Sequence, residues 1–255
     1  MKKFISFSGG VESTTMCVLF GKEADAIFAD TGFEHKEIYH RIDLIENWCR
    51  DFHRNDFKIQ KVKNTQHGSL PDYIKSINFY PSITKRFCTY LFKIKPIDDF
   101  LKQYEQEGAE IMIGLNLDEI DMRTGSHGLL PFVKYTYPLA DNLLSRKACI
   151  TILEHAGLAP NFPPYMKRGG CIGCYYKSKK EYIAMAALNP EEFKIVEDLE
   201  NEINANLTDR DKFFSILQNV KMSDIRSIAQ SLLFNPEDIY PVINNASKCG
   251  VFCNR

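Results

Sequence analysis

The first sixty residues alternate between short apolar runs and longer stretches with apolar residues at helical spacing. The apolar run at residues 4–7 predicts a buried strand, and after a glycine turn residues 13–20 predict a helix. Residues 26–28 predict a second strand, and residues 37–52 have the apolar spacing of an amphipathic helix. Residues 57–62 predict a third strand. This order is typical of a parallel, doubly wound α/β sheet.

The alternation continues past the middle of the chain and then stops. Residues 93–106 predict a helix, residues 110–113 a fourth strand, and residues 145–156 another helix. A proline-rich segment follows at residues 159–164. Beyond it the pattern predicts helices only, at residues 179–188, 190–206 and 222–233.

The change of pattern near residue 165 predicts two regions. We expect residues 1–165 to form a nucleotide-binding α/β domain and residues 166–255 to form a cysteine-containing loop followed by a helical C-terminal region. A chain of 255 residues is long enough for one such domain and a smaller appendage.

Composition and charge exclude few classes of function. The hydrophobic fraction of 44% and the charged fraction of 25% are those of a globular protein. The formal net charge of -1 gives no indication of a nucleic-acid partner, although a local basic patch would still allow one. The sequence shows no signal peptide and no membrane span, so we expect a cytoplasmic protein without a membrane partner, and it is neutral on oligomeric state.

The glycine turn after the first expected strand is the first candidate site. Residues 8–13 read Ser-Gly-Gly-Val-Glu-Ser and join a strand to a helix N-terminus. Free amides and the helix dipole favour phosphate there, and glycines let an anion approach the backbone. The spacing is neither that of a Walker A loop nor G-x-G-x-x-G. A tight turn without a ligand is the alternative. The candidate nucleotide-binding residues here are Ser6, Ser8, Gly9, Gly10, Glu12 and Ser13.

This turn resembles the PP-loop, S-G-G-x-D-S, of the adenine nucleotide α-hydrolase superfamily. Glu12 stands where the aspartate of that motif usually stands. Glutamate keeps the charge but reaches one methylene further, so we expect a different geometry toward a metal ion or a pyrophosphate.

The end of the second expected strand carries a further motif. Asp30-Thr31-Gly32-Phe33-Glu34 resembles the D-T-G-x-x-x-x-E segment of the phosphoadenosine phosphosulfate reductase branch of that superfamily, whose later glutamate falls near Glu37. The resemblance implies that Asp30, Thr31 and Gly32 bind the adenine nucleotide. A turn that only ends the strand is the alternative.

Two more segments are similar to the same branch. The stretch from Arg86 to Pro96 resembles R-x-C-T-x-x-L-K-x-x-P and makes Lys93 a candidate for binding phosphate. The stretch that begins at Gly114 resembles G-x-x-x-D-E followed by an arginine, here Arg123. Gly114 would let a nucleotide pass close to the backbone, and Arg123 would bind phosphate or sulfate through its planar guanidinium.

The eight cysteines are expected to be free, redox-active or metal-bound in a reducing compartment. Cys171 and Cys174 form a C-x-x-C motif, which by itself fits a zinc half-site, an iron–sulfur cluster or a redox dithiol. The family resemblance adds Cys88 and implies a [4Fe–4S] cluster, whose fourth ligand would be Cys253 or Cys249. Zinc and unmetallated thiols stay open.

The remaining cysteines and the histidines receive simpler interpretations. Cys17, Cys49 and Cys149 lie among apolar neighbours and are expected in the core. The six histidines form no metal-spaced pair, so we assign them no role.

The tail offers one further candidate. Lys248-Cys249-Gly250 resembles the E-C-G-L-H tail that carries the nucleophilic cysteine of sulfonucleotide reductases, with Lys248 and Phe252 in place of its glutamate and histidine. The resemblance makes Cys249 a catalytic candidate together with Lys93 and Arg123. An exposed thiol without a role is the alternative.

The resemblance as a whole implies an adenine-nucleotide-dependent enzyme that reduces adenylyl sulfate or its 3′-phosphorylated form, with a thioredoxin-like reductant. One alternative is an ATP-dependent adenylylating sulfurtransferase that uses Mg²⁺ and a sulfur donor to thiolate a nucleic acid or a small molecule. A non-catalytic nucleotide-binding module is a third interpretation.

Overall fold

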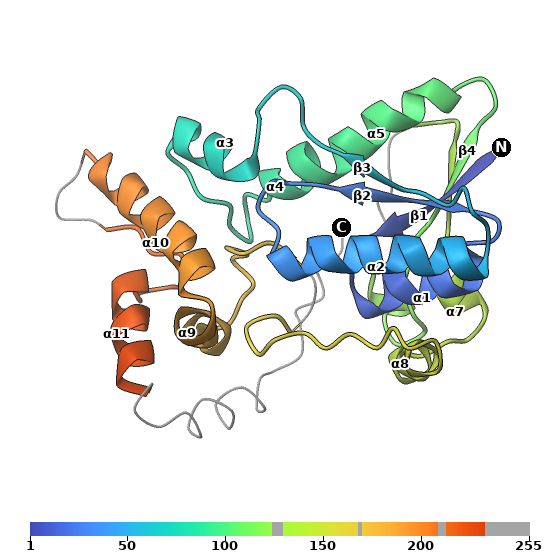
Figure 1. Cartoon of the computed structure of the whole chain (residues 1–255). Helices are drawn as coiled ribbons and strands as arrows, with labels where there is room; N and C mark the ends of the chain where they lie inside the picture. The colour runs from blue at the N-terminus through green and yellow to red at the C-terminus, as the bar shows by residue number, and fades with distance from the viewer. Residues whose placement is uncertain (124–129, 168–169, 209–212, 233–255) are drawn as a thin grey trace.

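The structure is a computed structural model that describes residues 1–123, 130–167, 170–208 and 213–232. Its centre is a five-stranded parallel sheet in the order β3-β2-β1-β4-β5 (Figure 1). The strands are β1 (Lys2–Phe7), β2 (Asp25–Ala29), β3 (Ile59–Val62), β4 (Ala109–Met112) and β5 (Val133–Thr136). In the central register Ile5 lies opposite Ala26 on one side and Met112 on the other. The doubly wound parallel sheet predicted from the sequence is therefore confirmed.

Helices cover both faces of this sheet, with α1 (Val11–Phe20) and α2 (Lys36–Phe52) on one face and α5 (Lys95–Leu101) on the other. The other described helices are α3 (Leu70–Ile77), α4 (Phe87–Thr89), α6 (Ile120–Arg123), α7 (Pro138–Asp141), α8 (Arg146–His155), α9 (Lys179–Leu188), α10 (Pro190–Ala205) and α11 (Met222–Leu232). None of the described helices combines the length and the apolar composition needed to cross a bilayer.

Alternating side chains of the strands divide the core into two layers. Ile5 of β1 and Phe28 of β2 face the layer that α1 and α2 cover. Phe4 and Ile27, one position away, face the layer under α5 (Figure 1). A strand buried on both faces reads as a continuous apolar run, and this is why β1 and β2 were predictable.

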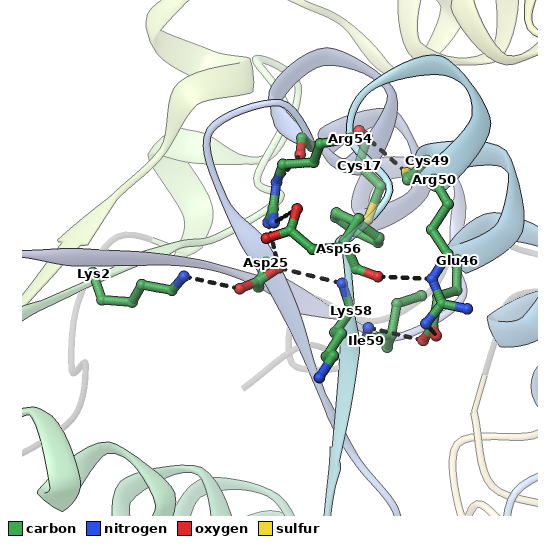
Figure 2. Close-up of polar contacts among 12 residues, drawn as sticks. Lys2, Cys17, Asp25, Glu46, Cys49, Arg50, Arg54, Asp56, Lys58 and Ile59 are labelled. Atoms are coloured by element: carbon green, nitrogen blue, oxygen red, sulfur yellow. Dashed lines mark hydrogen bonds and ion pairs between the residues drawn. The ribbon is translucent and has the colours of Figure 1, made fainter.

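Polar contacts hold the amino-terminal edge of the sheet. Figure 2 shows Asp25, at the start of β2, bound by Lys2 at 3.1 Å and by Arg54. Glu46 of α2 accepts a hydrogen bond from the backbone of Ile59 at 2.9 Å and pairs with Arg50. These contacts join α2 and the turn after it to the starts of β2 and β3. The predicted motifs lie at the other end of the strands.

The C-terminal helices belong to the same hydrophobic core as the sheet face under α1 and α2. Helices α9, α10 and α11 pack on one another, and α10 also packs on α3 (Figure 1). An ion pair of 2.9 Å between Lys75 and Glu202 joins α3 to α10. The division of the chain near residue 165 stays a prediction.

Several elements differ from the sequence predictions. Strand β5 was not expected, because its side chains are intermediate or exposed and form no apolar run. The short helices α3, α4, α6 and α7 were not expected either, since they are too short to show a clear period. The helix expected at residues 93–106 is interrupted, since a π-helical turn at Tyr90–Ile94 precedes α5 and a 3₁₀ turn at Lys102–Tyr104 follows it.

The start of α9 yields a stability prediction. Ser178 and Glu181 form a capping box, in which the Ser178 hydroxyl accepts from the Glu181 amide at 3.3 Å and the Glu181 carboxylate accepts from the Ser178 amide at 2.9 Å. We expect Ser178→Ala to lower the free energy of unfolding by about 1 kcal/mol, measured by urea denaturation. Ser227→Ala, on the exposed surface of α11, is the control and should change it little; equal effects would contradict the capping role.

Candidate functional site

The carboxyl ends of β1, β2 and β4 bring the predicted motifs to one edge of the sheet. The glycine loop (residues 8–13) follows β1, the second loop (residues 30–34) follows β2, and Gly114 follows β4 shortly after its end. The chain crosses from one side of β1 to the other between β3 and β4, so β1 and β4 flank the point where strand order reverses. In open α/β sheets this is where ligands bind.

The glycine loop is built by hydrogen bonds between its own serines. The Ser13 hydroxyl accepts from the Ser8 amide at 3.2 Å, lies 3.3 Å from the Ser8 hydroxyl and donates to the Gly10 carbonyl at 3.3 Å. Gly9 has a φ of 75°, which favours glycine. Gly10 precedes α1 and supplies no side-chain cap, so the first amides of α1 have no capping side chain. Such a helix start suits an anion.

Gly114 lies against the start of α1. A Cβ atom at Gly114 would lie 3.2 Å from the backbone carbon of Glu12 and 3.3 Å from the amide nitrogen of Ser13. The loops after β1 and β4 are therefore in contact, and the small residue at position 114 permits this contact.

The Glu12 side chain contacts other side chains of the same chain. Its carboxylate accepts a hydrogen bond from the Asn116 amide at 3.1 Å and forms an ion pair with Arg146 of α8. The residue is only 7% exposed. The contact therefore ties the glycine loop to the loop after β4 and to α8. Sequence reasoning missed Asn116 and Arg146, because both lie more than 100 positions from Glu12.

A buried arginine supports the glycine loop from α2. Arg41 donates from Nε to the carbonyl of Gly9 at 3.0 Å and from a terminal nitrogen to the Thr14 hydroxyl at 3.3 Å. Burial lowers the pKa of the Arg41 guanidinium. In the sequence this residue looks like any exposed charge on an amphipathic helix, so no local signal identifies it.

The second loop is shaped by Asp30. Its carboxylate accepts from the Gly32 amide at 2.9 Å and from the Tyr39 hydroxyl at 2.7 Å. Burial and then the bond to Asp30 raise the pKa of Tyr39 above its ordinary value. Gly32 has a φ of 67°, and a Cβ there would lie 2.7 Å from the Cβ of Ser69. The turn therefore requires glycine at this position.

The second loop also contacts the C-x-x-C motif. The Thr31 hydroxyl donates to Glu34 Oε1 at 2.9 Å, and the Cys171 thiol lies 3.4 Å from the same oxygen. Backbone pairing between Glu34 and Cys171, with a hydrogen bond of 2.7 Å from the Ile172 amide to the Phe33 carbonyl, fixes the two segments side by side. Two segments that lie 137 positions apart in the sequence are thus in direct contact.

Cys88, Cys174 and Lys93 complete this cysteine cluster with Cys171. Burial raises the pKa of the Cys171 thiol well above its ordinary value, Glu34 raises it further, and Lys93 opposes both. Burial also raises the pKa of Cys88. For Lys93 burial acts to lower the pKa, but Cys171, Glu34 and the other two thiols outweigh it and raise the pKa. Lys93 therefore interacts electrostatically with the cysteines, and its predicted role toward a nucleotide phosphate stays a prediction.

The glycine between the two cysteines of the motif is required by packing. A Cβ at Gly173 would lie 2.2 Å from the Tyr80 hydroxyl and 2.7 Å from the ring of Phe33. Tyr80 donates its hydroxyl to the Gly173 carbonyl, and Tyr182 donates to the Cys174 carbonyl at 3.1 Å. The C-x-x-C loop is thus held by two buried tyrosines.

Cys88, Cys171 and Cys174 are chemically available as ligands. All three thiols are free and partly buried, and thiolates bind both zinc and iron–sulfur clusters. The [4Fe–4S] cluster and its alternatives stay predictions.

Four predicted site residues remain, namely Ser6, Arg123, Cys249 and Cys253. Ser6 lies in β1 opposite Ile27 with its side chain partly buried. Arg123 ends α6, but its side chain is outside the described part of the chain, as are Cys249 and Cys253. The roles assigned to these four residues stay predictions. Cys17, Cys49 and Cys149 are buried in the core, as the sequence indicated.

The sheet and its site define a doubly wound α/β protein with a glycine loop at the reversal of strand order. Residues 2–121 match the family described as phosphoadenosine phosphosulfate reductase domain. This match agrees with the motifs of the sequence and confirms, for this part of the chain, the resemblance to the phosphoadenosine phosphosulfate reductase-like family of PP-loop proteins.

The chain also has a match among solved structures. Phosphoadenylyl-sulfate reductase from Candida auris, in its phosphate complex, is 13% identical, with a TM-score of 0.45. The match covers 63% of this chain and 74% of that one. A search of curated proteins gives no match.

The contact between Gly114 and the glycine loop yields a prediction. Gly114→Ala places a methyl group against Glu12, so the start of α1 must shift. We expect affinity for adenylyl sulfate, phosphoadenylyl sulfate or ATP to fall about tenfold, or about 1.4 kcal/mol, measured by calorimetry. Gly157→Ala is the control, since a Cβ there meets nothing within 4 Å although its φ is 69°. Unchanged binding in Gly114→Ala would remove this loop from the site.

Proposed function

We propose that this protein binds a sulfonucleotide, adenylyl sulfate or its 3′-phosphorylated form, and reduces the sulfate group. The family of residues 2–121 supports a nucleotide of this class. The observation that carries the proposal is the direct contact of Thr31 and Glu34 with Cys171. Through this contact, the loops at the carboxyl ends of the strands and the cysteine cluster form one continuous site.

The nucleotide would lie across the carboxyl ends of β1, β2 and β4. The uncapped amides at the start of α1 would bind the phosphate, and the hydroxyls of Ser8 and Ser13 would add donors. Gly114 leaves room for close approach of the ligand, and the turn at Gly32 would contact the adenosine. The buried contacts of Arg41 and Glu12 hold the glycine loop in place before the ligand arrives.

The cysteine cluster would hold a [4Fe–4S] group. Cys88, Cys171 and Cys174 would be three of its ligands, and Cys253 or Cys249 the fourth. Bound there, the group would supply redox-active iron beside the sulfate. Lys93 interacts electrostatically with these thiols and would offset their negative charge.

Cys249 would be the nucleophile, provided that Cys253 is the fourth ligand. Its thiolate would attack the sulfate sulfur, a sulfur–sulfur bond would form, and the bond from sulfur to the phosphate oxygen would break and release the adenosine phosphate. A thioredoxin-like dithiol would then attack the Cys249 sulfur, release sulfite and become a disulfide. Arg123 would neutralise the sulfate charge during this step.

Two other functions use the same pocket. ATP-dependent sulfur transfer, with Mg²⁺ on the pyrophosphate, is favoured by Lys248 and Phe252, which replace two residues of the reductase tail. A non-catalytic nucleotide-binding module is favoured by Glu12, whose carboxylate is engaged by Asn116 and Arg146.

Product analysis distinguishes the three functions. Anaerobic protein is incubated with adenylyl sulfate or phosphoadenylyl sulfate and thioredoxin, and separately with ATP and Mg²⁺. We expect sulfite from the sulfonucleotide, lost in Cys249→Ser while calorimetry shows that nucleotide binding persists. AMP and pyrophosphate from ATP would establish sulfur transfer instead. Binding without any product would establish the non-catalytic module.

The cluster is tested by composition. We expect about four irons and four sulfides per chain after anaerobic purification, with visible absorption that Cys171→Ser abolishes. Cys149→Ala is the matched control, because Cys149 lies in the core away from the motif. A colourless protein without iron would remove the cluster from the proposal and leave nucleotide binding intact.

A further inference from the structure

Three side chains with ligand-type atoms meet where α2 and α10 begin. His35 directly precedes α2, Glu37 lies in its first turn, and Glu192 lies in the first turn of α10. One nitrogen or oxygen atom from each of the three lies within 4.8 Å of the other two. Sequence reasoning assigned His35 no role, because Glu192 is 157 positions away.

The histidine is oriented by a carboxylate. His35 and Glu192 are 0% and 2% exposed, and His35 Nδ1 contacts Glu192 Oε2. Glu192 Oε1 accepts a hydrogen bond of 3.0 Å from the Lys36 amide. The His35 ring nitrogen and a Glu192 oxygen therefore face one another directly, and an ion held between them would bind both.

Two buried atoms of this group have no hydrogen-bond partner. They are His35 Nε2 and Glu37 Oε2. The other oxygen of Glu37 accepts from the Tyr165 hydroxyl at 2.5 Å, so the carboxylate is fixed. Among the described residues no lysine or arginine forms an ion pair with Glu37 or Glu192. Buried lone pairs without a partner are unfavourable, and two carboxylates this close together call for a cation.

We propose that His35, Glu37 and Glu192 form a binding site for a divalent transition-metal ion, separate from the cysteine cluster. An imidazole with two carboxylates suits ions such as Mn²⁺ or Zn²⁺. Bonds of about 2.0 to 2.2 Å place two ligands of one ion at most about 4.4 Å apart, so atoms already within 4.8 Å need only a small movement. The ion would offset both carboxylate charges.

The site would fasten the C-terminal helices to the nucleotide-binding domain. His35 directly follows Glu34, which contacts Cys171, while Glu192 belongs to α10. An ion bound here would therefore link α10 to the segment that carries the second loop. The inference is independent of sulfate reduction, since it involves neither the nucleotide nor the thiols.

Titration with Mn²⁺ tests the site. Mn²⁺ favours carboxylate ligands over thiolates, so it discriminates against the cysteines. The full chain is purified in the presence of a chelator, and the chelator is then removed. The protein is titrated with Mn²⁺ in the absence of nucleotide while the electron paramagnetic resonance signal of free Mn²⁺ is recorded. We expect one Mn²⁺ ion per chain in the wild type. In Glu37→Gln and in Glu192→Gln the affinity for Mn²⁺ should fall by about tenfold or more.

Matched variants separate this site from others. Glu191→Gln and His40→Gln alter exposed neighbours and should bind Mn²⁺ as the wild type does, as should Cys171→Ser. Circular dichroism of the metal-free proteins checks folding; if Glu192→Gln is unfolded, Glu37→Gln, which changes a less buried residue, decides. The proposal would be overturned if the wild type bound no stoichiometric Mn²⁺. It would also be overturned if Glu37→Gln left Mn²⁺ binding unchanged, or if Cys171→Ser abolished it.

Discussion

Thr31, Glu34 and Cys171 make the contact on which the arrangement of the site depends. A hydroxyl, a carboxylate and a thiol meet within 3.6 Å, and backbone pairing between Glu34 and Cys171 holds them together. The loop after β2 continues directly from an internal strand of the sheet, whereas the described C-x-x-C segment has no strand of its own. The sheet therefore positions the cysteines through this contact.

Buried charges around the site are compensated in three different ways. Glu12 is paired with Arg146 and receives a hydrogen bond from Asn116. Arg41 donates to the backbone carbonyls of Gly9 and Leu158 and to the Thr14 hydroxyl. For Lys93, electrostatic interactions with Glu34 and the thiols oppose the effect of burial and raise its pKa. Such groups cost free energy to bury, so their concentration at one edge of the sheet is typical of a functional site.

The sequence was informative wherever a signal is local. Apolar runs identified β1 and β2, because strands buried on both faces are continuously apolar. The glycines at positions 9, 32 and 114 stand where positive φ or close packing leaves little choice of residue. Short segments escaped prediction: β5 has four residues with intermediate or exposed side chains, and α3 has eight.

The sequence by itself determined the doubly wound sheet, the glycine loop at the end of β1 and the resemblance of residues 2–121 to the reductase family, since these depend on neighbouring residues. Only the tertiary structure decided which distant groups meet. Arg41 lies under Gly9, Arg146 lies against Glu12, and His35 lies beside Glu192. The physical reason is that hydrogen bonds and ion pairs act over a few ångströms in space, and separations of 32 to 157 positions leave no trace of them in a local pattern.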